Sequence, residues 1–193
     1  MLTLPARNQI VIGGILGLLM VATRGQHFAS LYSLPGASWA VFFLAGVYLR
    51  NVWSLAALLA LSWIVDFAAY YWGGASSFCI TPAYVFLLPA YSALWLAGRW
   101  YSQRHQFEWR TLLPLAAATL VGAVACELFS SGGFYFFSGR IAEPTFSAFI
   151  AQELQYFPAY FQSLAFYIGM AAVVHALFGL MNGTNQHHDT ITH

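Results

Sequence analysis

Four side chains in the first half of the sequence are suited to bind a metal or a polar ligand: His27, Asp66, Cys79 and Tyr84. Thiolate and imidazole bind soft and borderline metal ions, and carboxylate or phenol groups hydrogen-bond polar ligands. Asp66 interrupts an apolar stretch long enough to cross a bilayer, where an ionisable group is a functional candidate by default. The alternative for Asp66 is a structural carboxylate, hydrogen-bonded to a tyrosine or tryptophan of a neighbouring helix.

Cys79 follows a Gly-Gly-Ala-Ser-Ser segment at 73–77 that is typical of a loop. Three interpretations of this cysteine stay open: a metal ligand, half of a disulfide with Cys126, and a small buried side chain. The two cysteines lack the CxxC spacing of redox and zinc motifs. The main alternative to a ligand-binding protein is a small membrane protein for thiol or quinone redox chemistry that uses Cys79 and Cys126 as a working pair.

The composition indicates that the elements carrying these residues lie in lipid. Of the 193 residues, 60% are hydrophobic and only 7% are charged, against about 25% charged in soluble domains. The formal net charge is +1 and lysine is absent, which argues against a nucleic-acid partner. Length and composition therefore predict one all-α integral membrane domain in contact with the lipid bilayer.

Apolar runs between polar or turn-rich breaks predict six transmembrane helices. They cover 8–23, 37–49, 52–72, 82–101, 112–129 and 155–181. Residues 1–181 form the single membrane domain in this prediction, and 182–193 form a polar C-terminal tail. The apolar N-terminal stretch is interpreted as the first span, because no small-residue cleavage site follows it.

Arginines orient the predicted bundle, since cytoplasmic loops are enriched in basic residues. Five arginines fall on one side and two on the other, which predicts that both termini are cytoplasmic. The inner residues are Arg7, Arg50, Arg99, Arg104 and Arg110, and the outer residues are Arg24 and Arg140. Most of the polar residues of interest then gather at the outer end: His27, Asp66, Cys79, Tyr84, Cys126, Glu127, Glu143 and Glu153. For Glu127 and Glu153, near the interface, a solvated position is at least as good an interpretation as a functional one.

A pair of glycines and a run of aromatic residues each allow two interpretations. Gly13 and Gly17 form a small-xxx-small face, which suits packing inside the bundle or docking of a partner membrane protein. The aromatic run at 134–137 falls in the predicted last outer loop, where it lies at the lipid interface or closes over an apolar ligand.

Three segments of the sequence resemble the BtuM family of predicted cobalamin transporters. They are Gly25-Gln26-His27-Phe28, Trp63-Ile64-Val65-Asp66-Phe67 and Ser76-Ser77-Phe78-Cys79-Ile80-Thr81-Pro82-Ala83-Tyr84. The resemblance covers essentially the whole chain, and its most specific part is the set His27, Asp66, Cys79 and Tyr84. Six short spans with an outer ligand site are also similar to the S-components of energy-coupling-factor vitamin transporters.

The resemblance implies an S-component-like bundle in a bacterial inner membrane that takes up cobalamin at its outer face. In that reading Cys79 ligates the corrinoid cobalt as a thiolate and is expected to displace the cyano group of cyanocobalamin. His27 is a second candidate ligand to the cobalt. Asp66 and Tyr84 hold the cysteine loop or hydrogen-bond the amides at the corrin rim. The implied partner is a coupling module of a transmembrane subunit and ATPases, and no cofactor other than the bound cobalamin is expected.

Overall fold

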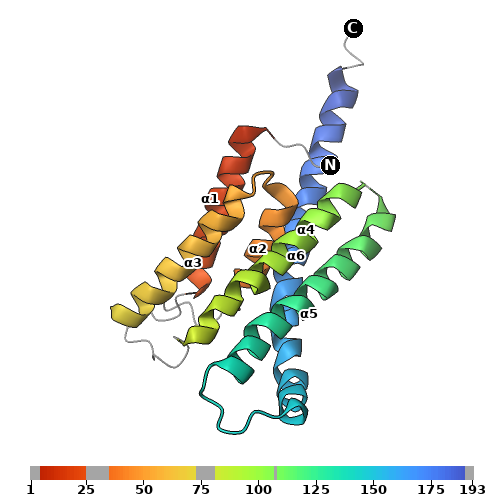
Figure 1. Ribbon diagram of the computed structural model, residues 1–193. Coiled ribbons are helices and arrows are strands. Elements are labelled where there is room, and N and C mark those ends of the chain that lie inside the picture. Colours follow the sequence, from red (N-terminus) through yellow and green to blue (C-terminus); the bar gives the residue numbers. More distant parts are fainter. Residues whose placement is uncertain (1–4, 25–34, 73–80, 107, 190–193) are drawn as a thin grey trace.

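The computed structural model describes residues 5–24, 35–72, 81–106 and 108–189 (Figure 1). Within these ranges the chain forms six α-helices and two short 3-10 helices, and it contains no strand, as the sequence predicted. The helices are α1 (Ala6–Arg24), α2 (Ser38–Tyr48), α3 (Trp53–Tyr71), η2 (Pro82–Phe86), α4 (Leu87–Arg104), η3 (Trp109–Thr111), α5 (Leu112–Phe137) and α6 (Phe146–Asp189).

Four segments in the described part are long and apolar enough to cross a membrane. They are Ala6–Arg24, Trp53–Tyr71, Trp109–Phe137 and Phe146–Gly179. The remaining two helices differ from this group: α2 has only 11 residues, and α4 is less apolar. At 1.5 Å per residue α2 is about 16 Å long, roughly half the thickness of the hydrocarbon layer.

The boundaries of the last two helices differ from the sequence prediction. The predicted loop beginning at Ser131 is wrong, because α5 continues through Gly132 and Gly133 to Phe137. A Cβ atom at Gly133 would lie 2.5 Å from the ring of Phe86, so this glycine provides room for close packing. Helix α6 starts at Phe146 instead of 155, includes Pro158, and continues through 182–189, where the sequence predicted a polar tail.

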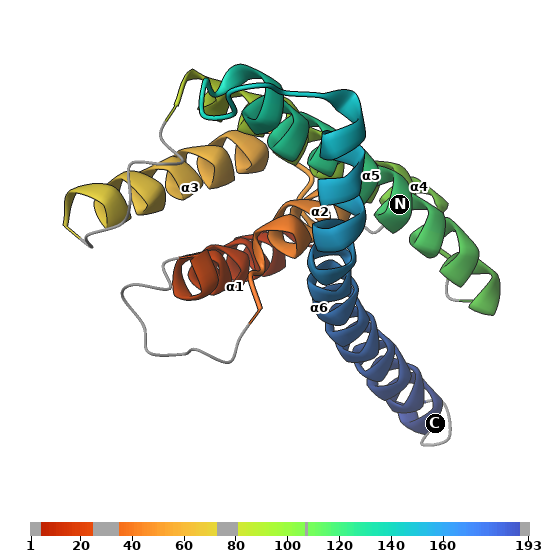
Figure 2. The same cartoon turned by 90° about the horizontal axis from the view of Figure 1, so that it is seen from below.

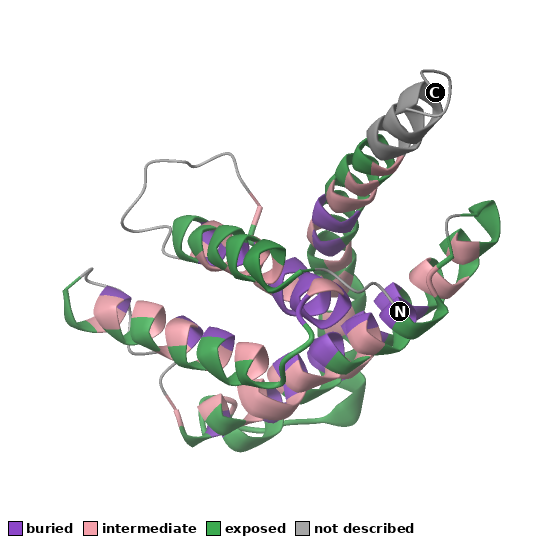
Figure 3. Cartoon of the chain, turned by 90° about the horizontal axis from the view of Figure 1, so that it is seen from above, coloured by how far each residue is buried: buried purple, intermediate pink, exposed green. Residues whose placement is uncertain are grey.

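The core is built around α2, whose residues from Ala40 to Val47 are all buried. Figure 3 shows buried residues gathered on the central helices, with much of the outer surface of α1 and α3 exposed. The backbones of α2 and α4 touch at two glycines. A Cβ atom at Gly46 would lie 2.0 Å from the carbonyl oxygen of Trp95, and one at Gly98 would lie 2.0 Å from that of Phe43. Small residues therefore permit the closest helix contact in the core, as is common in membrane bundles.

The other helices are arranged around this pair. Helix α4 packs between α2 and α5, while α1 packs against α2 and α3. Figure 2 shows α1 and α3 on one side of the bundle and α5 and α6 on the other. The chain runs so that α1 begins, and α6 ends, at the same end of the bundle (Figure 1). We call this the His175 end, and we call the opposite end, where α1 meets the last turns of α3, the Asp66 end.

Gly13 and Gly17 of α1 face other residues of the same chain. A Cβ atom at Gly13 would meet Leu49 at 3.7 Å, and one at Gly17 would meet Leu61 at 3.4 Å. These are ordinary or slightly tight contacts with neighbouring side chains. Of the two interpretations of this small-xxx-small face, packing inside the bundle is the one that the contacts support.

Candidate functional site

The Asp66 end is organised around the guanidinium group of Arg24, the last residue of α1. Its Nε and one terminal nitrogen each donate a hydrogen bond of 2.7 Å to the two carboxylate oxygens of Asp66 on α3. The other terminal nitrogen donates to Ser38 Oγ at 3.0 Å and to the hydroxyl of Tyr91 at 2.7 Å. This paired geometry is the strong, planar recognition for which arginine is suited.

Asp66 also accepts a short hydrogen bond from the hydroxyl of Tyr84 on η2. Two of the four residues singled out from the sequence are therefore in direct contact. Ser38 belongs to α2 and Tyr91 to α4, so the cluster joins five elements at one point. We call Arg24, Ser38, Asp66, Tyr84 and Tyr91 the Arg24 cluster.

The Arg24 cluster is largely shielded from solvent. The side chain of Arg24 is 12% exposed and that of Asp66 is 26% exposed. The guanidinium also lies 5.4 Å from the ring centroid of Tyr91, within the range of a cation–π interaction. Such a buried charge needs a partner, because its desolvation otherwise costs several kcal/mol. The interpretation of Asp66 as a structural carboxylate bonded to a neighbouring tyrosine agrees in part with this geometry. Tyr84 is that tyrosine, and Arg24 is an additional partner.

One hydrogen bond joins the described residues on either side of 25–34, and another joins Pro35 to α6. Thr23 Oγ1 donates to the carbonyl of Leu19 at 2.8 Å and accepts from the backbone N–H of Ala37 at 3.2 Å. The hydroxyl of Tyr167 on α6 donates to the carbonyl of Pro35 at 2.7 Å. The point where the chain leaves α1 and the point where it enters α2 are therefore fixed relative to each other.

Two buried polar atoms near the Arg24 cluster have no hydrogen-bond partner among the described residues: the indole nitrogen of Trp63 and the hydroxyl of Thr81. The Trp63 ring lies 6.0 Å from that of Tyr84, and the backbone carbonyl of Thr81 accepts a hydrogen bond from the Tyr84 N–H at 2.9 Å. Buried polar groups are nearly always paired in native proteins. These two atoms are therefore unpaired polar groups buried at this end of the bundle.

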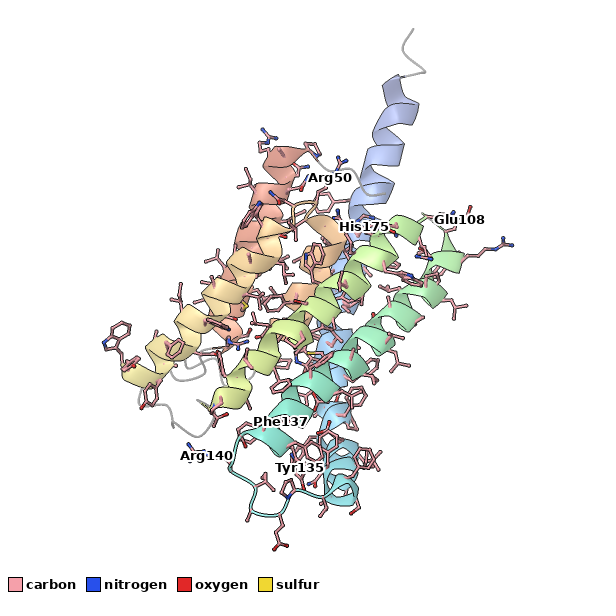
Figure 4. All side chains as sticks on the ribbon, in the orientation of Figure 1. Arg50, Glu108, Tyr135, Phe137, Arg140 and His175 are labelled. Atoms are coloured by element: carbon pink, nitrogen blue, oxygen red, sulfur yellow. The ribbon has the colours of Figure 1, made fainter. Side chains whose placement is uncertain are left out.

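The acidic residues of α5 and α6 do not belong to the Arg24 cluster. Glu127 is 4% exposed and accepts a hydrogen bond of 2.8 Å from Ser131, so the solvated interpretation is wrong for this residue. Glu153 is partly buried, and Glu143 is exposed in the connection before α6. Tyr135 packs against Phe149 with ring centroids 5.4 Å apart, so the aromatic run lies in the last turns of α5 beside α6 (Figure 4).

Two residues predicted to bind a metal, His27 and Cys79, lie outside the described residues. Cys126 is a free thiol and is fully buried in α5. A buried thiol is poorly placed for exchange with a soluble partner, so the redox interpretation gains no support from it. Among the residues that the structure describes, no group of three histidine, cysteine or acidic side chains could hold a metal ion.

No protein-family model matches the chain, and no curated protein matches it. The similarity to cobalamin transporters therefore rests on the three sequence segments given above.

Sequence reasoning missed Arg24, Ser38 and Tyr91. It placed Arg24 in an outer loop and counted it only as a topological signal. A usable signal was present, because a carboxylate inside an apolar helix requires a cation at the same depth. On the predicted topology only two arginines, Arg24 and Arg140, lie on the side of Asp66.

Proposed function

We propose that this protein binds a corrinoid of the cobalamin type at its Asp66 end and takes it up across a bacterial inner membrane. The observation that carries the proposal is the contact of Asp66 with Tyr84 inside the Arg24 cluster. These are two of the four residues on which the resemblance to cobalamin transporters depends. The other two, His27 and Cys79, belong to the segments 25–34 and 73–80, which are bordered by described residues of this same end.

The chemistry of a corrinoid agrees with the groups available there. A corrin ring is a flat apolar surface with amide groups at its rim, and such ligands need apolar walls with a few convergent polar groups. The unpartnered N–H of Trp63 is a donor for a rim carbonyl, and the Thr81 hydroxyl both donates and accepts. The oxygens of Asp66 are already bonded to Arg24 and Tyr84. We therefore assign Asp66 and Tyr84 to positioning the cysteine segment, and the rim contacts to Trp63 and Thr81.

Cys79 provides the metal chemistry in this proposal. Its thiolate donates an electron pair to cobalt(III), and the cyano group of cyanocobalamin leaves with its own pair as cyanide. The exchange forms a sulfur–cobalt bond, breaks a carbon–cobalt bond and changes no oxidation state. A soft thiolate is a suitable ligand for such a metal, and the charge of the metal favours the deprotonated sulfur. His27 is a second candidate ligand to the cobalt, on the same face as Cys79 or on the opposite one.

The cellular setting follows from the arginine distribution and the resemblance. Both termini face the cytoplasm, the Asp66 end faces the outer side, and lipid surrounds the long helices. An energy-coupling module with a transmembrane subunit and ATPases is the proposed partner for release. Gly13 and Gly17 pack within the chain, so such a module would use another surface of the bundle.

The test is a visible absorption spectrum of the purified protein with cyanocobalamin. We expect a bound corrinoid with a shifted spectrum in the wild type and in Cys126→Ala, and an unshifted spectrum in Cys79→Ala. Cys126→Ala is the matched control, because it removes the buried thiol of α5 and leaves Cys79 in place.

The three possible failures have different meanings. Binding without a spectral shift would retain the vitamin and reject thiolate ligation. Loss of the shift in both cysteine variants would favour a redox pair over a ligand. Absence of any corrinoid binding by the folded wild-type protein would overturn the proposed function.

A further inference from the structure

A cavity of about 370 Å³ lies at the His175 end, far from the Arg24 cluster. Residues of α2, α4, η3, α5 and α6 line it, and most of its wall is aliphatic or aromatic. Its polar lining includes Tyr48, Tyr101, His105, Glu108 and His175. Figure 4 shows Glu108 and His175 at the same end of the bundle. The volume falls in the range of sites for small organic ligands.

The aromatic rings in this wall are arranged around the two histidines. The rings of His105 and His175 meet edge-on with centroids 5.1 Å apart, and the ring of Tyr48 lies 5.9 Å from that of His175. Flat rings in an otherwise apolar wall provide stacking surfaces for another flat, apolar molecule. The shape and chemistry of the wall therefore favour a planar ligand.

One hydrogen bond positions the ring of His105. The hydroxyl of Tyr101 and Nδ1 of His105 lie 3.0 Å apart. In the tautomer that the proposal uses, Tyr101 donates its proton to Nδ1. A neutral histidine whose Nδ1 accepts carries its proton on Nε2. His105 thus offers one N–H donor, which an acceptor such as a carbonyl oxygen would satisfy.

The charges around the cavity favour a neutral ligand. Among the described residues that line the cavity there is no arginine, so no fixed positive charge is present to pair with an anion. The one carboxylate among them, Glu108, is exposed, so it provides no buried partner for a cation. Burial and the neighbouring His175 lower the pKa of His105, which keeps this ring uncharged at neutral pH. Arg50, Arg99 and Arg104 belong to the same end, and their field opposes a cation.

We propose that this cavity binds a neutral, planar carbonyl compound of the quinone class, with a ring carbonyl accepting a hydrogen bond from Nε2 of His105. The apolar wall receives the ring and the start of a hydrophobic tail. The proposal concerns binding only and includes no electron transfer. It is independent of the corrinoid proposal, because the two sites lie at opposite ends of the bundle and share no residue.

The experiment compares two probes of the same shape in the purified protein. Menadione carries two ring carbonyls, and 2-methylnaphthalene carries none. Binding is measured by quenching of tryptophan fluorescence, since Trp109 lines the cavity. We expect the wild type to bind both probes and to prefer menadione. His105→Phe should lower the ratio of the affinities for menadione and 2-methylnaphthalene about fivefold, which corresponds to the loss of one hydrogen bond. The ratio between the two proteins cancels the different partitioning of the probes into detergent.

A second pair of variants tests the location. Ala172→Phe places a ring inside the cavity and is expected to abolish binding of both probes. Ala151→Phe adds the same ring at an exposed position near the start of α6 and is expected to bind like the wild type. An unchanged preference in a folded His105→Phe protein would overturn carbonyl recognition. Equal binding by Ala172→Phe and the wild type, or binding of neither probe by the wild type, would overturn the site.

Discussion

Replacing Arg24 with methionine is expected to destabilise the protein far more than the loss of a typical surface arginine. Arg24 donates four hydrogen bonds to three side chains, two of them to Asp66. Its removal leaves the Asp66 carboxylate with Tyr84 as its one remaining partner in the Arg24 cluster. An ion that stays buried without its counterion is the costly result of such a change.

The magnitude follows from burial. Breaking a fully buried ion pair by removing one partner costs about 3–5 kcal/mol. Asp66 is 26% exposed and retains the Tyr84 hydroxyl, which places the expected loss for Arg24→Met near the lower bound, at about 3 kcal/mol. Asp66→Leu is expected to cost a similar amount, because it leaves the Arg24 guanidinium, which is 12% exposed, without its counterion.

The double variant Arg24→Met/Asp66→Leu separates this explanation from a general loss of packing. It leaves no unpaired buried charge, so its cost should be smaller than the sum of the single costs by about 2 kcal/mol. The assay is reversible unfolding in mixed micelles, followed by circular dichroism. Arg7→Met, at an exposed position of α1, is the control and should change stability by less than about 0.5 kcal/mol. Additive single costs in the double variant would refute the role given to the ion pair.

Three further predictions concern other parts of the molecule. Gly98→Ala should lower the free energy of unfolding by about 3 kcal/mol or prevent folding, because its Cβ would lie 2.0 Å from a backbone oxygen of α2. The control is Gly14→Ala, whose Cβ would have nothing within 4 Å. This variant should be neutral or slightly stabilising in the same unfolding assay. Because the pKa of His105 is lowered in the folded protein, this histidine takes up a proton more readily in the unfolded chain as pH falls below about 6.5. The free energy of unfolding should therefore decrease on acidification by up to about 1.4 kcal/mol per pH unit. Chemical unfolding between pH 7 and 5 should show a smaller slope for His105→Phe. An unchanged slope would contradict a lowered pKa of His105 in the folded protein. In a Cys79→Ala background, Cys126 should react with a polar maleimide only after the protein is unfolded, because the Cys126 side chain is fully buried. Rapid labelling of the native protein would show that α5 is packed differently.

The helices could be predicted well where apolar runs end at polar or turn-rich residues. Such runs predicted α1, α2 and α3 to within two residues. The prediction failed where tertiary packing changes the effect of a residue on the local secondary structure. A Ser-Gly-Gly sequence usually breaks a helix, but in α5 Gly133 gives room to the ring of Phe86. Helix α6 similarly begins at Phe146, ahead of the predicted start at 155, and it continues to Asp189 through the predicted polar tail.

The candidate site could be predicted in part. A carboxylate in an apolar helix marked Asp66 correctly as a residue with specific partners, and Tyr84 is one of them. The partner with the larger effect, Arg24, was not predicted, because the positive-inside rule treats arginines as loop charges. Ser38 and Tyr91 could not be found from the sequence at all. Their side chains meet Arg24 only because α2 and α4 converge on the end of α1.

The shortness of α2 has a consequence for how the chain is made. A segment of 11 residues, of which 40–47 are all buried, is too short to cross a bilayer as a span of its own. In the proposed membrane topology, α2 would enter the bilayer together with α1 or α3, which pack against it. The face of α2 at Gly46 stays bare until α4 arrives, since the carbonyl of Trp95 is what fills it. Nascent chains that end before α4 should accordingly be recognised and degraded as incomplete, which makes the synthesis of α4 the step that commits the protein to its fold.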